Sequence, residues 1–376
     1  MLAVLCTIMA ACNDDTEKRS FISKFRILGI QANPPEAVTG DNVEVLGIFA
    51  PKVGHAASVA FVTLDTGWIA ELDAVLPENV EQYSAAQLQA LLDSLLAESG
   101  VDSVSASNLL VPQFKVVTVP VNADTGLAIL PAENIVISPS LVAIMKLLGQ
   151  TEGIPLYLLA CSNGVIDEAA LLESTRQLTN SQEIGSLETT CRGVDVSAIA
   201  AFKTLNIRIP DDSKTVADDV NANPQIKLFQ IEETLHLPNT PPGETGTMVC
   251  EGSDGCRDPF RFRVAVHKSD FQYYQGFSRR ENEMEKMFVS WFSNGGELAP
   301  SRIRSDNAQT AADAMADGDI AKMDELLKDT APFNWFTVEW LPPVEGGVFD
   351  LWVVANDLRG GVGYARYQIR ADAGNY

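Results

Sequence analysis

The chain has 376 residues, is 46% hydrophobic and carries a formal net charge of −23 at neutral pH. This length exceeds one typical domain, and this hydrophobic content excludes an intrinsically disordered chain. The negative charge argues against nucleic acid and anionic lipid head groups as partners, because both attract basic surfaces, and it mainly favours solubility.

Residues 1–11 form an uncharged, mostly apolar run that ends at Cys12 and is followed at once by polar residues. The run is shorter than the roughly 20 residues of a membrane-spanning helix, but it suits the apolar core of a secretory signal. The segment from Ile8 to Cys12 resembles the lipobox of bacterial lipoproteins. This resemblance implies that residues 1–11 are a signal peptide, that Cys12 is lipidated, and that residues 12–20 tether the protein to the cell envelope, most simply at the outer membrane. The alternative is an ordinary apolar N-terminus with Cys6 and Cys12 unmodified.

Four further cysteines, Cys161, Cys191, Cys250 and Cys256, are an even number, which indicates disulfides in an exported protein. Four cysteines allow three pairings. We expect near neighbours to pair, Cys161 with Cys191 and Cys250 with Cys256. Their spacing does not fit a zinc site built from two C-x₂-C units.

The N-terminal half combines predicted strands with helices. Short apolar or alternating runs predict strands at residues 25–30, 43–48, 59–64, 114–121, 154–160 and 204–209. Ser84 and Gln87 form a capping box, and four leucines between 88 and 95 share one helix face before Gly100, so a helix is expected there. Further helices are expected at residues 140–148 and 167–178. The acidic, polar residues 211–223 are typical of an interdomain linker.

The C-terminal half is richer in predicted strands. They lie at residues 226–231, 247–249, 260–266 and 286–292, followed by a hairpin of residues 348–355 and 363–369. A helix is expected at residues 310–327. A strand, a Pro-Pro turn, a glycine and a strand occur in both halves, with the prolines at Pro34-Pro35 and Pro241-Pro242. This repeated pattern indicates two copies of one β-module.

The final hairpin and the opening turn carry a family resemblance. The residues concerned are Phe349, Leu351, Val353, Asn356, Asp357, Gly360, Gly361, Tyr364, Arg366 and Tyr367, with Asn33, Pro34, Pro35, Glu36, Gly40 and Asp41 at the start. They resemble immunoglobulin-like (Ig-like) sandwich domains of bacterial surface proteins, and Trp291 stands where such domains often place a core tryptophan. Phe349 and Leu351 replace the tyrosine and second cysteine of antibody domains.

The resemblance implies a mostly β protein with two Ig-like β-sandwich domains. The first would span residues 21–210, with a helical insertion at about 75–112 and 138–190, and the second residues 224–376. Such domains bind or space other molecules, and the fold implies no activity.

The sequence contains no nucleophile elbow, zinc-protease, phosphate-loop or dinucleotide motif. The three histidines, His55, His236 and His267, are far apart in the chain, and we expect no catalytic residue and no metal site. The alternative is calcium at acidic clusters, although these do not follow the EF-hand spacing. These clusters are Asp211-Asp212, Asp218-Asp219 and Asp313 with Asp317-Gly318-Asp319.

One segment of this acidic chain is both aromatic and basic. Tyrosine and arginine are favoured at protein interfaces, so we interpret the segment as a candidate interface, the alternative being a core-facing bend between two strands. Its residues are Phe271, Tyr273, Tyr274, Phe277, Arg279 and Arg280.

Three functions remain open at this stage. The first is a non-enzymatic, lipid-anchored envelope protein that binds envelope or surface proteins in a surface assembly. The second is a binding protein for a small ligand or glycan, using a pocket beside the helices. The third is a hydrolase with a non-contiguous site. A deep apolar pocket favours a ligand, whereas an aromatic surface patch favours a protein partner.

Overall fold

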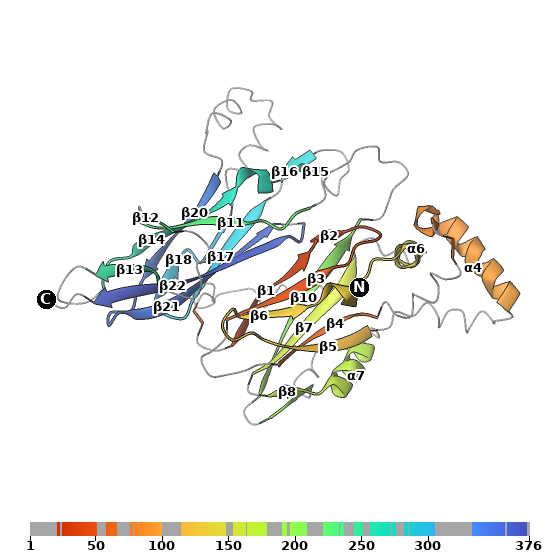
Figure 1. The fold of residues 1–376 in the computed structure, drawn as a ribbon, viewed down its shortest axis with the longest axis horizontal. Helices are drawn as coiled ribbons and strands as arrows, with labels where there is room; N and C mark the ends of the chain where they lie inside the picture. The colour runs from red at the N-terminus through yellow and green to blue at the C-terminus, as the bar shows by residue number, and fades with distance from the viewer. Residues whose placement is uncertain are drawn as a thin grey trace, which may run out of the picture. The chain divides into compact units, whose positions relative to one another are not determined.

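Strands dominate the fold, and the expected mostly β class is confirmed (Figure 1). The computed structural model describes residues 21–22, 25–50, 58–65, 76–77, 79–99, 114–147, 153–162, 164–178, 190–193, 196–208, 221–232, 234–236, 244–250, 256–271, 273–275, 282–284, 286–304, 333–357 and 359–373. The expected linker and the helix at residues 310–327 lie largely or wholly outside these ranges.

The chain divides into two units. The N-terminal unit is Phe25–Asn223 with Leu358–Val362, and the C-terminal unit is Pro224–Asp357 with Gly363–Tyr376 and the N-terminal segment Met1–Lys24. Phe21 and Ile22, which we expected in the first domain, therefore belong to the C-terminal unit. There the Ile22 N–H donates a 2.7 Å hydrogen bond to the Ser293 oxygen.

The N-terminal unit contains two main sheets. The smaller has the order β1-β3-β6, made of β1 (Arg26–Asn33), β3 (Glu44–Ala50) and β6 (Leu127–Leu130). The larger has the order β2-β10-β7-β4-β5, made of β2 (Glu36–Ala37), β10 (Ser197–Ile207), β7 (Ile154–Ser162), β4 (Ser58–Leu64) and β5 (Phe114–Pro120). A small ladder joins β8 (Val165–Ile166) to β9 (Cys191–Arg192). The middle strand β7 falls inside residues 138–190, a stretch we expected to be part of the helical insertion.

The two main sheets share one core, because alternate residues of each strand point inward. Val45 and Leu130 from the smaller sheet lie in the same buried cluster as Phe61, Leu158 and Leu205 from the larger. The N-terminal unit is therefore a two-layer sandwich.

Helices lie beside this sandwich. They are α4 (Ala85–Ser99), α6 (Pro139–Leu147) and α7 (Glu168–Leu178), with short 3₁₀ turns η2 (Val80–Gln82) and η3 (Ala132–Asn134). The capping box predicted for α4 is present, since the Ser84 N–H donates to Gln87 Oε1 at 2.8 Å and the Gln87 N–H to Ser84 Oγ at 3.4 Å. Leu88 of α4 is buried against Val80 and Ala143, which explains the leucine spacing.

The C-terminal unit is a second sandwich. One sheet has the order β12-β11-β14-β20-β18, made of β12 (Thr234–His236), β11 (Ile226–Ile231), β14 (Phe260–His267), β20 (Phe333–Leu341) and β18 (Glu297–Ala299). The other has the order β13-β22-β21-β17-β19, made of β13 (Glu244–Cys250), β22 (Val362–Ala373), β21 (Gly347–Asp357), β17 (Met287–Ser293) and β19 (Arg302–Arg304). The turn η5 (Lys268–Asp270) precedes a ladder of β15 (Tyr273–Gln275) and β16 (Asn282–Met284).

Large aromatic residues fill the core of this second sandwich. Trp291, expected as a core tryptophan, is completely buried on β17 between β21 and β19. Phe229 and Tyr367 stack with ring centroids 4.0 Å apart, and Trp340 stacks on Phe262 at 5.4 Å. Inward-facing residues of both sheets therefore meet in one core.

The two sandwiches have related strand orders. The sheet β2-β10-β7-β4-β5 corresponds strand by strand to β13-β22-β21-β17-β19, and β1-β3-β6 corresponds to β11-β14-β20, which β12 and β18 extend at its two edges. In each, the first strand pairs antiparallel with the next long strand, as β1 with β3 and β11 with β14. In each, the segment after the Pro-Pro pair of the sequence forms a strand parallel to the last strand of the unit, as β2 with β10 and β13 with β22. The repeated sequence pattern equates residues 43–48 with residues 247–249, whereas the strand pairing equates β2 with β13.

Candidate functional site

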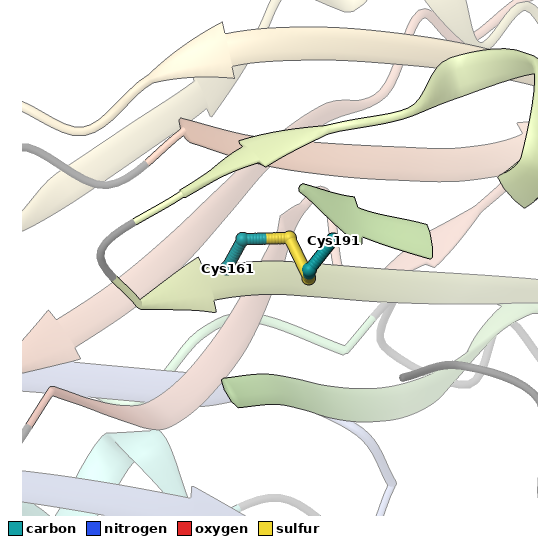
Figure 2. Close-up of a disulfide and its surroundings, with 2 residues drawn as sticks. All are labelled: Cys161 and Cys191. Carbon is teal, nitrogen blue, oxygen red and sulfur yellow. A yellow bond between two sulfur atoms is a disulfide. The ribbon is translucent and has the colours of Figure 1, made fainter. Parts of the chain in front are cut away.

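Two disulfides crosslink the described part of the chain, and they join the same cysteine pairs that we expected from the sequence. Cys161, at the end of the central strand β7, is bonded to Cys191 of β9 with Cα atoms 5.7 Å apart (Figure 2). Cys250, at the end of β13, is bonded to Cys256 with Cα atoms 4.9 Å apart. Disulfides are typical of extracellular and periplasmic proteins.

The aromatic-basic segment predicted as an interface is only partly described. Phe271 is 8% exposed and belongs to the buried core of the C-terminal unit, so this residue is not part of a surface patch. The backbone of Tyr273 and Tyr274 pairs with Glu283 and Met284 in the β15–β16 ladder. Phe277, Arg279 and Arg280 lie outside the described residues.

A different aromatic and basic surface lies on the C-terminal unit. It is the outward side of the β13-β22-β21-β17-β19 sheet, where side chains alternate with those of the core. We call it the aromatic–arginine face, and it consists of Phe288, Arg302, Asp350, Trp352 and Arg366. Its residues come from four neighbouring strands that are separated in the sequence, so the sequence pattern did not predict this surface.

Arginine side chains cover aromatic rings on this face. The Arg302 guanidinium carbon lies 4.4 Å from the centre of the Phe288 ring, and that of Arg366 lies 5.6 Å from the centre of the Trp352 ring. Both distances are within the range of cation–π attraction. Trp352 is only 2% exposed, whereas Arg302 is exposed.

An acidic residue holds one of these arginines in place. Arg366 donates from Nε and Nη2 to Asp350 Oδ1 at 3.1 and 3.0 Å. Within the described part of the chain, the exposed Arg302 forms no such ion pair, so its positive charge remains in reach of an approaching group. An arginine displayed over an aromatic ring suits contact with acidic or aromatic side chains.

The opposite sheet of the same unit offers a useful comparison. Arg263 lies over Trp335 at 4.7 Å and donates to Gln230 Oε1 at 3.0 Å. Arg261 approaches Glu232 at 3.9 Å, with about half of each side chain exposed. The charge of Arg261 is thus matched by an adjacent carboxylate.

A small apolar recess lies between α4 and α6 in the N-terminal unit. Its cavity volume is about 10 Å³, which is room for about one water molecule and far less than a drug-sized ligand needs. The recess does not favour the ligand-binding alternative. It is lined by Leu76, Leu88, Leu91, Leu92, Ala143, Ile144 and Leu147.

The residues considered for metal or acid–base chemistry do not form a cluster in the described part of the chain. No group of three His, Cys, Asp or Glu side chains suited to a metal ion occurs among the described residues. His267 Nδ1 lies 2.6 Å from Ser269 Oγ, His236 lies on β12, and His55 is outside the described ranges. The aspartates at positions 211, 212, 218, 219, 313, 317 and 319 are also outside them.

Burial or a hydrogen bond at a helix start explains the shifted pKa values of the described side chains. Burial raises the pKa values of Tyr157, Tyr364 and Tyr367. The Ala170 N–H lowers the pKa of Asp167 by donating a hydrogen bond to its carboxylate at the start of α7, and Arg192 lowers it further.

In the described ranges, no helix has the length and apolar character needed to cross a membrane.

Comparison with known proteins assigns no family. No protein-family model and no curated protein sequence matches the chain. Among solved structures, red sea bream transglutaminase is 12% identical with a TM-score of 0.22, the alignment covering 94% of this chain and 32% of that one. Escherichia coli alpha-2-macroglobulin activated by porcine elastase is 10% identical with a TM-score of 0.20, covering 94% and 22%. Dimeric latent PorU from Porphyromonas gingivalis is 9% identical with a TM-score of 0.22, covering 94% and 24%. The chain thus spans a third or less of each of these three structures, and the likeness carries no function.

Proposed function

We propose that this protein is a non-catalytic, lipid-anchored component of the bacterial cell envelope that binds other envelope proteins. The lipobox-like segment ending at Cys12 supports the anchor, and the two disulfides suit an oxidising compartment. Two sandwiches with related strand orders support the assignment as Ig-like modules, which commonly bind or space other molecules.

The observation that carries the binding role is the aromatic–arginine face. In a chain of net charge −23, an exposed Arg302 stacked on Phe288 is a local exception. Arginine and aromatic residues supply much of the binding energy at protein interfaces. Opposite charge also speeds the encounter with an acidic partner surface.

The binding role is tested by crosslinking intact cells and recovering the protein through a C-terminal tag. The wild type should recover specific envelope proteins, and Arg302→Glu should lose them. Arg261→Glu is the matched control, because Arg261 is an exposed arginine on the other sheet of the same unit. Equal recovery by the wild type and Arg302→Glu would refute this face as the binding site.

The anchor is tested separately by metabolic labelling with a radioactive fatty acid. The wild type should incorporate label and sediment with membranes, and Cys12→Ser should do neither. Cys6→Ser is the control for a second cysteine in the same apolar run. A labelled Cys12→Ser variant would rule out lipidation at this position.

A further inference from the structure

The N-terminal unit carries an open strand edge whose counterpart in the C-terminal unit is covered. In the C-terminal unit, β13 pairs with the last strand β22 over residues 368–373. In the N-terminal unit, β2 pairs with the last strand β10 only at Asn206 and Ile207. Among the described residues, no strand pairs with residues 198–202 on the side away from β7.

The burial of inward-facing side chains follows this difference. Tyr367 and Ile369 of β22 are 2% and 0% exposed. On β10, Leu205 is also fully buried, next to the point where β2 pairs. Ile199 and Ala201, which face the same core, are only partly buried. The core is thus less well covered where the neighbouring strand is missing.

The outward side of this edge is apolar. Phe202 is 58% exposed and its ring lies 5.2 Å from that of Tyr157 on β7, and Ala200 is exposed beside it. Lys203 is the only charged residue between Val196 and Asn206, and no proline occurs there. Proteins usually protect a long edge with charges, prolines or bulges, because an unprotected edge pairs with other strands.

The sequence of the edge is complementary to itself. If two copies of β10 pair antiparallel about Ala200, each Phe202 faces Ala198 of the second copy and each Ile199 faces Ala201. A large side chain then meets a small one on both sides of the sheet, which is how cross-strand pairs pack well. An antiparallel pair about one central residue has two-fold symmetry, the commonest symmetry of protein dimers.

We propose that β10 is a dimerisation edge, at which a second copy of this chain adds its own β10 and joins the two five-stranded sheets into one. Addition of a strand supplies main-chain hydrogen bonds for affinity, and the apolar side chains supply register. The pairing removes Phe202 and Ala200 from water and completes the cover of Ile199. This inference does not depend on the proposed lipid anchor or on the aromatic–arginine face.

Salt dependence follows from the charge of the chain. Two copies of net charge −23 repel one another, and salt screens this repulsion over a distance of about 10 Å at 0.1 M. Because the paired edges contain no acidic residue, self-association should strengthen as salt is added. An association based on charge attraction would weaken instead.

The proposal is tested with the full chain by analytical ultracentrifugation over a range of concentrations. The wild type should shift from monomer to dimer, and Ala200→Lys should remain monomeric, since like charges would meet at the symmetry axis. Ala200→Glu alone should also be monomeric, and mixing the two variants should restore the dimer. Ala200 is exposed, so thermal unfolding of the variants should match the wild type at a concentration where the wild type is monomeric.

Crosslinking gives a second, independent readout. Opposed Cα atoms of an antiparallel pair lie about 4.5–5.5 Å apart, a separation that a disulfide spans. Ala200→Cys should therefore form a covalent dimer on oxidation. Ile129→Cys is the matched control, since Ile129 is 47% exposed on β6, an edge strand of the other sheet. The wild type gives the baseline for Cys6 and Cys12.

Three outcomes would overturn the proposal. The first is a wild type that stays monomeric at every concentration and salt. The second is a dimer that Ala200→Lys leaves intact, which would place the contact elsewhere. The third is equal crosslinking of Ala200→Cys and Ile129→Cys.

Discussion

Trp340 Nε1 donates a hydrogen bond of 2.9 Å to the backbone oxygen of Gly295, and both residues are buried. Trp340 lies on β20, and Gly295 lies in the turn after β17, which belongs to the opposite sheet of the C-terminal unit. One bond thus links the two layers of the sandwich where β17 ends. Ser293 Oγ donates to the same oxygen at 2.5 Å.

Replacing Trp340 by phenylalanine tests this link. Trp340→Phe removes the donor and leaves a gap beside Phe262, so we expect a loss of about 2–4 kcal/mol in the free energy of unfolding. Trp335→Phe is the control, because Trp335 lies on the outward side of the same strand under Arg263. Urea denaturation measures the free energy of unfolding of both variants. Equal losses in the two variants would contradict the role of the Trp340–Gly295 hydrogen bond.

Gly296 makes the same turn possible. Its φ is +75°, and an added Cβ would lie 2.4 Å from the Leu341 oxygen and 2.5 Å from Trp340 Nε1. Gly296→Ala should destabilise the protein more than Gly40→Ala. Gly40 also has a positive φ, +96°, but an added Cβ there has open space, so only the backbone cost of about 1–2 kcal/mol applies. Thermal unfolding that ranks the two variants in the reverse order would argue against this contact.

The two disulfides should differ in their contributions to stability. Cys161 and Cys191 are 30 positions apart, and Cys250 and Cys256 are 6 apart. A bridge that closes a longer loop restricts the unfolded chain more, so loss of the first should cost about 3–4 kcal/mol and loss of the second about 2 kcal/mol. The double variants Cys161→Ala/Cys191→Ala and Cys250→Ala/Cys256→Ala, compared in guanidinium, measure the difference. A larger loss in the second variant would refute the loop-length argument.

Asp167 should make the stability of the N-terminal unit depend on pH. Its pKa is lowered in the folded chain by the Ala170 N–H and by Arg192. The stabilisation of the folded state by the Asp167 carboxylate is therefore fully present above the ordinary aspartate pKa of about 4. It is lost as pH falls through the lower pKa of the folded state.

Asp167→Asn isolates this effect, because asparagine also accepts a capping hydrogen bond but has no charge. Hydrogen exchange of the amides in α7 should be faster in the variant than in the wild type at neutral pH, and the two should converge in acid. A difference that persists unchanged in acid would show that the charge of Asp167 is not its cause.

Local sequence patterns were sufficient for the elements that short-range forces determine. The capping box at Ser84 and the leucine spacing predicted α4, because a helix satisfies its hydrogen bonds within one segment. Alternation of apolar residues predicted β14, since one face of this strand lies in the core. The cysteine pairs were predictable because a short loop keeps two neighbours close.

Strand partners were decided by the tertiary structure. The chain from Phe333 to Leu341 alternates core and surface residues, yet we did not predict β20, which lies between β14 and β18. Aromatic residues also suit both a core and an interface, so sequence placed Phe271 in a surface patch although it is buried. The surroundings of that ring depend on which strands cover it.

The mostly β class, the disulfide pairs and helix α4 followed from the sequence alone. Strand pairing required the tertiary structure, which brought Arg302 over Phe288 and left the edge of β10 open. The physical reason is range: propensity, capping and short loops act within a few residues, whereas sheet pairing joins segments far apart in the chain.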